Sequence, residues 1–451
     1  MIKRQSGVLL PVFSLPGAFG IGTLGAGARA FIDRMAEAGF SLWQTLPLCP
    51  PDGYRSPYAG RSSFACDTAL LDPYEMAAAD LLSEREAAAL ALDERDTVDA
   101  AAVAARLPQL AAAADRADRA AVEQFLHTYP ETAAYCRFVS DGEGRDFFGE
   151  AFLQYEFRRE WEALRTYAHS RSVTVIGDLP MYPAPDSCDL RTHPEAFLAE
   201  GAVAGAPPDA FAAEGQIWGN PLYDYAAMRR EGFSFLRQRF AFQRALFDGL
   251  RLDHFRGFSS YYAIPQGGTA AEGRWCEGPG QALFDALREE LRGYPVIAED
   301  LGVIDEATCR LRAENGFLST RVFQFAFLGD PASPHLPENC HEDSAVYSGT
   351  HDNDTLMSFL AALPEEKRAE IFAYCDAREG EAPIHSVIRT LLASRATLAI
   401  LPLADLLGLG SEARINVPGR ADGNWCWRVT GEALAALDAE GYLAMNREAG
   451  R

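Results

Sequence analysis

Four acidic residues of this chain follow short apolar runs that have the length of buried strands. They are Asp178, Asp253, Glu299 and Asp352. A single acid in such a place is often only a helix N-cap or a turn former. Four acids far apart in the sequence indicate one shared site if the runs are strands of a parallel barrel, because the carboxyl ends of barrel strands lie at one face.

Convergent carboxylates suit the chemistry of glycosidic bonds. The transition state resembles an oxocarbenium ion, so one carboxylate attacks or stabilises the sugar while one carboxylic acid protonates the leaving oxygen. Arg251 stands two residues before Asp253, so both side chains face the same side of a strand. A neighbouring guanidinium favours the ionised carboxylate. Asp253 is therefore the candidate nucleophile.

The other acids differ in their neighbours. Asp300 follows Glu299 directly and should face the opposite way. Glu299 is then free to have a raised pKa and to act as general acid/base. His351 and Asp352 are suited to hydrogen bonds with sugar hydroxyls, which strengthen in the transition state.

The elements that must position these residues follow a regular alternation. The predicted strands are residues 7–12, 41–48, 173–176, 249–253, 296–299, 321–325, 345–348 and 398–401. Helical periodicity appears between several of them, as at residues 26–38, 283–291 and 306–312. Alternating strands and helices predict an α/β fold with a parallel sheet, and eight strands favour a closed (β/α)₈ TIM barrel. We predict one catalytic barrel across residues 1–451.

Two stretches depart from the alternation. Residues 73–167 are rich in Ala, Glu, Asp and Arg and predict a helical insertion subdomain, because no heptad is sustained. Residues 181–225 are rich in Pro, Gly and aromatics and predict a long loop region that caps the active site. Loops of this length in a compact domain are usually functional.

Composition narrows the partners and the compartment. The chain has 451 residues, of which 48% are hydrophobic and 23% charged, so it can form a large core. Its net charge of -23 disfavours nucleic acid and anionic membranes as partners. The nine cysteines have no C-x-x-C spacing, and the first residues lack a secretory apolar segment. We expect a soluble, cytoplasmic protein and, although the sequence leaves the oligomeric state open, a monomer.

Other motifs carry less weight. Residues 20–25 match the dinucleotide pattern G-x-G-x-x-G, but they do not follow a strand directly, and no acid ends the next strand. Residues 352–354 begin like a calcium loop without its later Gly and Glu. His341 and Glu342 lack the second His of a zinc helix. We therefore expect no metal.

Several ordered motifs resemble those of the 4-α-glucanotransferases, or amylomaltases. The resemblance covers residues 7–428, and the matching segments are Ser56-Pro57-Tyr58, Gly177-Asp178-Leu179-Pro180, residues 215–223 (GQIWGNPLY), residues 251–257 (RLDHFRG), residues 298–302 (AEDLG), residues 349–354 (GTHDND) and residues 406–416 (LLGLGSEARIN). Residues 215–223 resemble that family's substrate-capping loop. So many motifs in one order make the resemblance specific.

The resemblance implies a function and a set of site residues. The family implies disproportionation of α-1,4-glucan oligosaccharides with retention and without a cofactor. The catalytic residues it implies are Asp253, Glu299 and Asp352. The substrate-binding residues it implies are Tyr58, Asp178, Gln216, Trp218, Asn220, Arg251, His254, Phe325 and His351.

The chain also departs from the family pattern. Ala210 stands where a Tyr is usual, Arg191 where a Trp is usual, Ala404 where a Gln is usual, and Cys66-Asp67-Thr68 where Gly-Asn-Pro is usual. These changes thin out the aromatic surface around the acceptor. They leave open the chain-length preference and the ratio of transfer to hydrolysis, so an α-glucan hydrolase with the same chemistry is the alternative. A binding protein with vestigial acids is a third possibility, which the intact acids disfavour.

Overall fold

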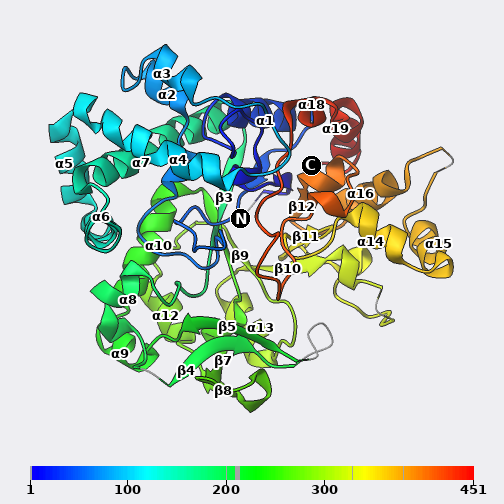
Figure 1. Ribbon diagram of the computed structural model, residues 1–451. Helices are drawn as coiled ribbons and strands as arrows, with labels where there is room; N and C mark the ends of the chain where they lie inside the picture. The colour runs from blue at the N-terminus through cyan, green and yellow to red at the C-terminus, as the bar shows by residue number, and fades with distance from the viewer. Residues whose placement is uncertain (1–2, 200, 209–213, 328, 379) are drawn as a thin grey trace.

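The computed structural model describes residues 3–199, 201–208, 214–327, 329–378 and 380–451. Among these residues, eight parallel strands form a closed barrel in the order β1-β12-β11-β10-β9-β6-β3-β2 (Figure 1). Their bounds are β1 Gln5–Leu9, β2 Leu42–Gln44, β3 Thr174–Leu179, β6 Gly249–Leu252, β9 Val296–Ala298, β10 Leu318–Val322, β11 Ser344–Tyr347 and β12 Leu398–Pro402. The predicted (β/α)₈ barrel is confirmed.

The largest shift from the predicted start of a barrel strand is at β10. Strand β10 spans Leu318–Val322, whereas the prediction was residues 321–325, and the 3₁₀ turn Phe323–Phe325 follows it. Its polar residues hide the strand from a search for apolar runs. They are buried because they have partners: Ser319 N–H bonds the Asp343 carbonyl at 2.8 Å, and Thr320 Oγ1 bonds the Ala298 carbonyl at 2.9 Å.

Helices surround the barrel. The α-helices of the described residues are α1 Ala26–Glu37, α2 Pro73–Ala78, α3 Glu84–Ala89, α4 Ala100–Ala112, α5 Arg119–Thr128, α6 Pro130–Glu143, α7 Phe147–Ser170, α8 Cys188–Thr192, α9 Tyr225–Arg230, α10 Ser234–Leu246, α11 Arg256–Ser259, α12 Gln281–Ala286, α13 Glu306–Glu314, α14 Leu356–Ala362, α15 Glu365–Tyr374, α16 Pro383–Ala393, α17 Leu403–Leu406, α18 Gly431–Ala435 and α19 Ala439–Glu448. No helix among them is long and apolar enough to cross a membrane.

The helices between β2 and β3 divide into two groups. Helices α2, α3, α5 and α6 lie at the outer edge of the molecule in Figure 1. Helix α7 instead packs on the barrel, where Trp161 contacts Trp43 of β2 with ring centroids 6.2 Å apart and donates to the Leu246 carbonyl at 2.8 Å. The last helix of this stretch thus serves as the barrel's crossover into β3.

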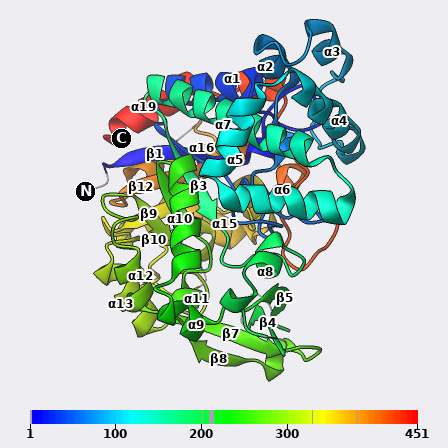
Figure 2. The ribbon, with the colours of Figure 1, turned by 90° about the vertical axis from the view of Figure 1, so that its left-hand side faces the viewer.

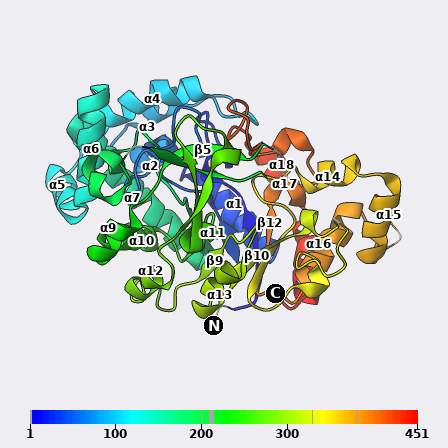
Figure 3. The ribbon, with the colours of Figure 1, turned by 90° about the horizontal axis from the view of Figure 1, so that it is seen from below.

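A second sheet lies outside the barrel. It is antiparallel in the order β5-β4-β7-β8, with β4 Ala202–Ala206, β5 Gln216–Pro221, β7 Ser260–Pro265 and β8 Arg274–Glu277. The sequence predicts only loop at residues 181–225, because β4 and β5 are short and the third strand of the sheet comes after β6 in the chain. Arg451 bonds the carbonyls of Gln5 and Thr397 at the amino ends of β1 and β12. Figures 2 and 3 place β5 at the opposite end of the molecule from this C-terminus, on the side of the carboxyl ends of the barrel strands.

The barrel wall separates the two largest parts of the core in the described residues. Alternate strand residues fill the barrel, namely Leu9, Leu42, Ile176, Ile297, Leu318, Ala345, Tyr347, Leu398 and Ile400. Residues of the opposite parity, such as Trp43, pack outward against the helices. The packed interior holds the strand ends rigidly, so side chains that leave those ends have defined positions.

Candidate active site

A buried arginine joins two of the predicted acids. Asp178 and Arg251 are register partners on β3 and β6. Arg251 Nη1 donates to both carboxylate oxygens of Asp178 at 2.8 Å and to Asp253 Oδ1 at 3.0 Å. The side chains of Arg251 and Asp178 are 6% and 0% exposed, whereas that of Asp253 is 24% exposed. Asp253 is therefore the member of this cluster that a substrate can reach.

Glu299 reaches the same cluster from β9. Its Oε2 accepts the backbone N–H of His254 at 2.8 Å, so the carboxyl lies at the peptide unit next to Asp253. Burial raises the pKa of Glu299 to about 8, with the negative charges of Asp253 and Asp352 adding to the effect and Arg251 opposing it. Asp300 accepts the Thr320 N–H at 2.8 Å, away from the other acids, as strand alternation predicts.

Three ring side chains, Tyr58, His351 and Trp425, pack together beside the cluster. Tyr58 Oη donates to Asp178 Oδ2 at 2.7 Å, and its ring stacks on His351 with centroids 4.8 Å apart. His351 Nε2 lies 3.4 Å from Asp352 Oδ1. Trp425 packs behind both rings, 5.8 Å from Tyr58 and 5.9 Å from His351. Residues from three separate loops and two strands thus meet at one face of the barrel.

Strand β5 brings a further group toward the acids. The Trp218 ring lies 4.8 Å from His254 in an edge-to-face arrangement, and its indole N–H donates to Gln216 Oε1 at 2.9 Å. Asn220 Nδ2 donates to the Pro183 carbonyl at 2.8 Å, which ties β5 to the segment after β3. The second sheet therefore carries Trp218 to the cluster and uses Asn220 to hold the strand in place.

Phe325 does not lie on a strand, although the sequence predicts one over residues 321–325. It lies in the turn after β10 and contacts His335 edge to face at 5.6 Å.

Two of the departures from the family pattern concern the loops around the site. Ala210 lies outside the described residues, and the Arg191 guanidinium lies over the Phe138 ring of α6, 5.9 Å from the ring centroid.

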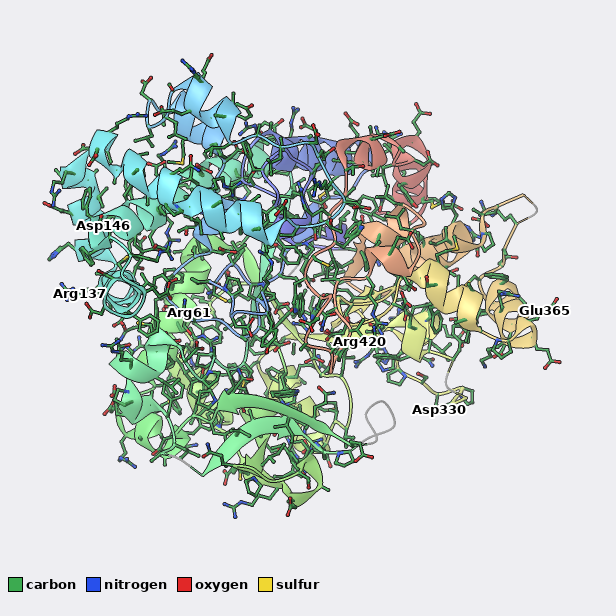
Figure 4. The ribbon with its side chains drawn as sticks, in the orientation of Figure 1. Arg61, Arg137, Asp146, Asp330, Glu365 and Arg420 are labelled. Carbon is green, nitrogen blue, oxygen red and sulfur yellow. The ribbon has the colours of Figure 1, made fainter. Side chains whose placement is uncertain are left out.

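The segment after β12 supplies residues that sequence reasoning missed. Asn416 Nδ2 donates to Asp352 Oδ1 at 2.6 Å, and Arg414 Nη2 donates to the Asp352 carbonyl at 2.6 Å. The motif at residues 406–416 was a signal, although it did not say what these side chains contact. Figure 4 labels Arg420 a few residues further on, near the middle of the view, far from Glu365 at the right-hand edge.

Comparison with known proteins identifies the family of this chain. A family model described as 4-alpha-glucanotransferase matches residues 10–146 and 142–434. The chain belongs to the 4-alpha-glucanotransferase family. It is 39% identical to the 4-alpha-glucanotransferase of Aquifex aeolicus over 94% of this chain and 95% of the relative. It is 36% identical to the chloroplastic/amyloplastic 4-alpha-glucanotransferase of Solanum tuberosum over 97% of this chain and 84% of the relative.

Solved structures of 4-alpha-glucanotransferases show the same architecture. The amylomaltase from Streptococcus agalactiae, solved in complex with acarbose, matches with a TM-score of 0.95 and 31% identity over 100% of both chains. An α-amylase from Geobacillus thermoleovorans matches with a TM-score of 0.52 at 12% identity, over 99% of this chain and 79% of that one, and this likeness concerns the fold alone.

The raised pKa of Glu299 predicts a pH-dependent stability in this 4-alpha-glucanotransferase. The pKa of this carboxyl rises from 4.5 in the unfolded chain to about 8 in the folded protein. The unfolded chain therefore ionises first, so the free energy of unfolding falls as the pH rises from 4.5 to about 8 and stays lowered above that pH. Glu299→Gln removes this effect and keeps an oxygen for the His254 N–H. We expect the melting temperature of the variant to exceed that of the wild type by about 2 °C or more at pH 9, and the two to agree at pH 4.

Calorimetry at both pH values checks this expectation. Glu306→Gln, at an exposed glutamate of α13, is the matched control and should change neither value. A Glu299→Gln variant that melts at or below the wild type at pH 9 would show that the buried carboxyl costs nothing.

The contact between Asn416 and Asp352 predicts a loss of turnover. Asn416→Ala removes the donor that orients Asp352, so we expect kcat to fall by about 10–100-fold, with a smaller change in KM. Asn424→Ala is the control, because Asn424 bonds Val417 and Arg420 of the same segment without touching Asp352. Steady-state kinetics on maltotriose distinguish the two. Equal losses in both variants would mean that only the fold of the segment matters.

Proposed function

We propose that this chain transfers α-1,4-glucan segments between maltodextrins by a retaining double displacement, with Asp253 as nucleophile and Glu299 as general acid/base. The observation that supports these roles most strongly is that Glu299 Oε2 accepts the N–H of His254, the residue next to Asp253, while the negative charge of Asp253 adds to the raised pKa of Glu299. A retaining mechanism needs its two carboxyls close together, on either side of the scissile bond. Membership of the 4-alpha-glucanotransferase family supports transfer as the reaction.

The two carboxyls have different tasks in the first step. The Asp253 carboxylate attacks the anomeric carbon of the donor, and the bond to the leaving oxygen breaks as Glu299 gives that oxygen its proton. Arg251 donates to Asp253 Oδ1 and leaves the other oxygen free for attack. Because burial raises the pKa of Glu299 to about 8, this carboxyl still holds its proton at neutral pH.

The second step reverses these tasks. Glu299, now ionised, takes the proton of the 4-hydroxyl of an acceptor glucan, and that oxygen attacks the glucosyl carbon and releases Asp253. Two inversions at one carbon give net retention. An acceptor sugar in place of water is what makes the reaction a transfer.

The remaining site residues have binding tasks in this proposal. Tyr58 stacks on the sugar that is transferred, and its hydroxyl is fixed by Asp178. His351 and Asp352 bond the hydroxyls of that sugar. Gln216, Trp218, Asn220 and Phe325 line the donor and acceptor positions, and Arg251 holds the nucleophile. We propose no cofactor and no metal, because both steps are carried by protein carboxyls.

Incubation with maltotriose tests this function. We expect glucose and a ladder of longer oligosaccharides, because each cleavage product is passed to another maltotriose. Chromatographic separation of the products, with reducing ends counted in parallel, measures the outcome. Transfer leaves the number of reducing ends constant, and a protein inert on maltotriose and on longer α-1,4-glucans would refute the proposal.

Arg191 favours hydrolysis as the second candidate. It lies over Phe138, at a position where the family usually has a tryptophan, so it offers no aromatic face to an acceptor. Weaker acceptor binding lets water compete for the glucosyl-enzyme. In that case reducing ends rise without longer products, and Arg191→Trp shifts the balance toward the ladder.

A further inference from the structure

The residue after the proposed nucleophile has an unusual backbone. His254 has φ 45°, in the left-handed region that favours glycine. It lies between Asp253, at the end of β6, and the short helix α11, which begins at Arg256. An ordinary residue adopts this conformation only where surrounding contacts hold it, and such residues concentrate at functional sites.

Two successive N–H groups, one on each side of this left-handed residue, bond Glu299. Asp253 N–H bonds the Leu179 carbonyl of β3 at 3.1 Å, on one side of β6. In a continuing strand the next two N–H groups would point first to β9 and then back to β3. The His254 N–H follows this pattern, since it points to the β9 side and bonds Glu299 Oε2 at 2.8 Å. The Phe255 N–H departs from it, because it bonds the Glu299 carbonyl at 3.0 Å instead of turning back to β3. The left-handed turn thus holds both the carboxyl and the backbone of Glu299.

The imidazole of His254 is half-buried and packed on two sides. Trp218 of β5 packs edge to face against it, with the ring planes 86° apart. On another side, a Cβ added to Gly257 would lie 3.2 Å from His254 Cδ2 and 2.8 Å from Met181 Cε, so Gly257 lets the chain pack closely against the ring. Burial lowers the pKa of His254 to about 4, so the ring is neutral at neutral pH. A neutral, half-buried ring is suited to packing.

We propose that His254 is a positioning residue whose left-handed backbone orients the Glu299 carboxyl for proton transfer, and that Trp218 fastens this conformation by packing against the ring. The inference rests on the proposed acid/base role of Glu299. The expectation that the imidazole of His254 binds sugar stays a prediction, and the substitutions below distinguish the two roles. Positioning by His254 also gives the second sheet a part in the chemistry, because β5 carries Trp218.

The pH profile of kcat/KM measures this role through its basic limb, which is the fall of kcat/KM at high pH. The His254 N–H favours ionised Glu299, so its loss raises the pKa of Glu299 and moves the basic limb of kcat/KM upward. The other charged groups around Glu299 are Arg251, Asp253 and Asp352, and Arg256 acts on His254. None of these is changed by a substitution at His254, so they remain a constant background.

Three substitutions at His254 separate the backbone from the ring. His254→Asn and His254→Gly tolerate a left-handed backbone, whereas the β-branched His254→Val disfavours it. We expect the valine variant to lose about 10–100-fold in kcat and to shift the basic limb upward by about one pH unit. The asparagine and glycine variants should keep the limb within about 0.3 unit.

Matched variants control for strain and for the contact with Trp218. Ser172 is an exposed residue with φ 61° remote from the site, and Ser172→Val should cost stability without moving the pH profile. Trp218→Leu should shift the limb in the same direction as His254→Val, and Trp218→Phe should shift it less. If the valine variant does not fold by circular dichroism, His254→Ala serves in its place, because it also lacks the tolerance of glycine.

The outcomes are distinguishable. The proposal is overturned if the basic limb of kcat/KM stays at the wild-type pH in the valine or alanine variant. It is also overturned if KM rises equally in all His254 variants, because that result would indicate that the ring binds sugar. Failure of the proposed function gives another result, since Glu299→Gln would then process maltotriose at the wild-type rate. Measurements use the full chain and maltotriose from pH 5 to pH 10.

Discussion

Asp253→Asn should lower kcat for maltotriose by about 10⁴-fold or more, for transfer and hydrolysis alike. The asparagine side chain keeps the shape of Asp253 and an oxygen for the 3.0 Å bond from Arg251. It lacks the negative charge that attacks the anomeric carbon, so no glucosyl-enzyme forms. Timed chromatography of the products measures the loss.

Two further variants make this expectation decisive. Asp330→Asn, at an exposed acid of the loop after β10 that lies toward the lower right of Figure 4, should keep wild-type activity. Asp253→Gly leaves room for a small anion, so azide should restore cleavage and yield a glycosyl azide of inverted configuration. Activity of Asp253→Asn within tenfold of the wild type would assign the nucleophile to another group.

Glu299→Gln should lower kcat for maltotriose by about 10³–10⁴-fold, because it removes both the proton donor and the later base. The wild-type rate should itself fall as the pH rises through about 8, where Glu299 loses its proton. With an α-maltosyl fluoride donor the leaving group needs no proton. The first step should then proceed, and a covalent adduct should accumulate, since nothing activates the acceptor.

Intact-mass spectrometry detects that adduct. The double variant with Asp253→Asn should form none, which locates the covalent bond, and Glu306→Gln at an exposed glutamate should behave as the wild type. If the fluoride donor fails to rescue the glutamine variant while the fold is intact, Glu299 has some task other than proton transfer.

The barrel and its acids follow from local sequence. Most of the barrel strands are short runs with their own apolar side chains, and the four acids that follow such runs are visible without knowledge of the neighbouring strands. Once the strands are parallel and closed, Asp253 and Glu299 must share a face. The pairing of Arg251 with Asp253 follows from their spacing of two residues, and the structure confirms it at 3.0 Å.

Elements defined by distant partners escape this reasoning. Strand β4 pairs with β5 and also with β7, which comes after β6 in the chain, so the sheet that contains β4 and β5 depends on a distant segment. Strand β10 carries polar residues that are stable only beside the carbonyls of Ala298 and Asp343. Phe325 was therefore expected on a strand and lies in the turn after it. In each case the stabilising partner is far away in the sequence.

The fold class and the family could be predicted from the sequence alone and are confirmed, because they depend on residue types in local patterns. The same patterns named the candidate acids, but the way in which these acids are held depends on tertiary contacts. The left-handed backbone of His254, its contact with Trp218 and the bond from Asn416 to Asp352 arise from packing between segments far apart in the chain. A backbone angle or a hydrogen bond of this kind is set by the surrounding contacts, and a local pattern of residues does not encode it.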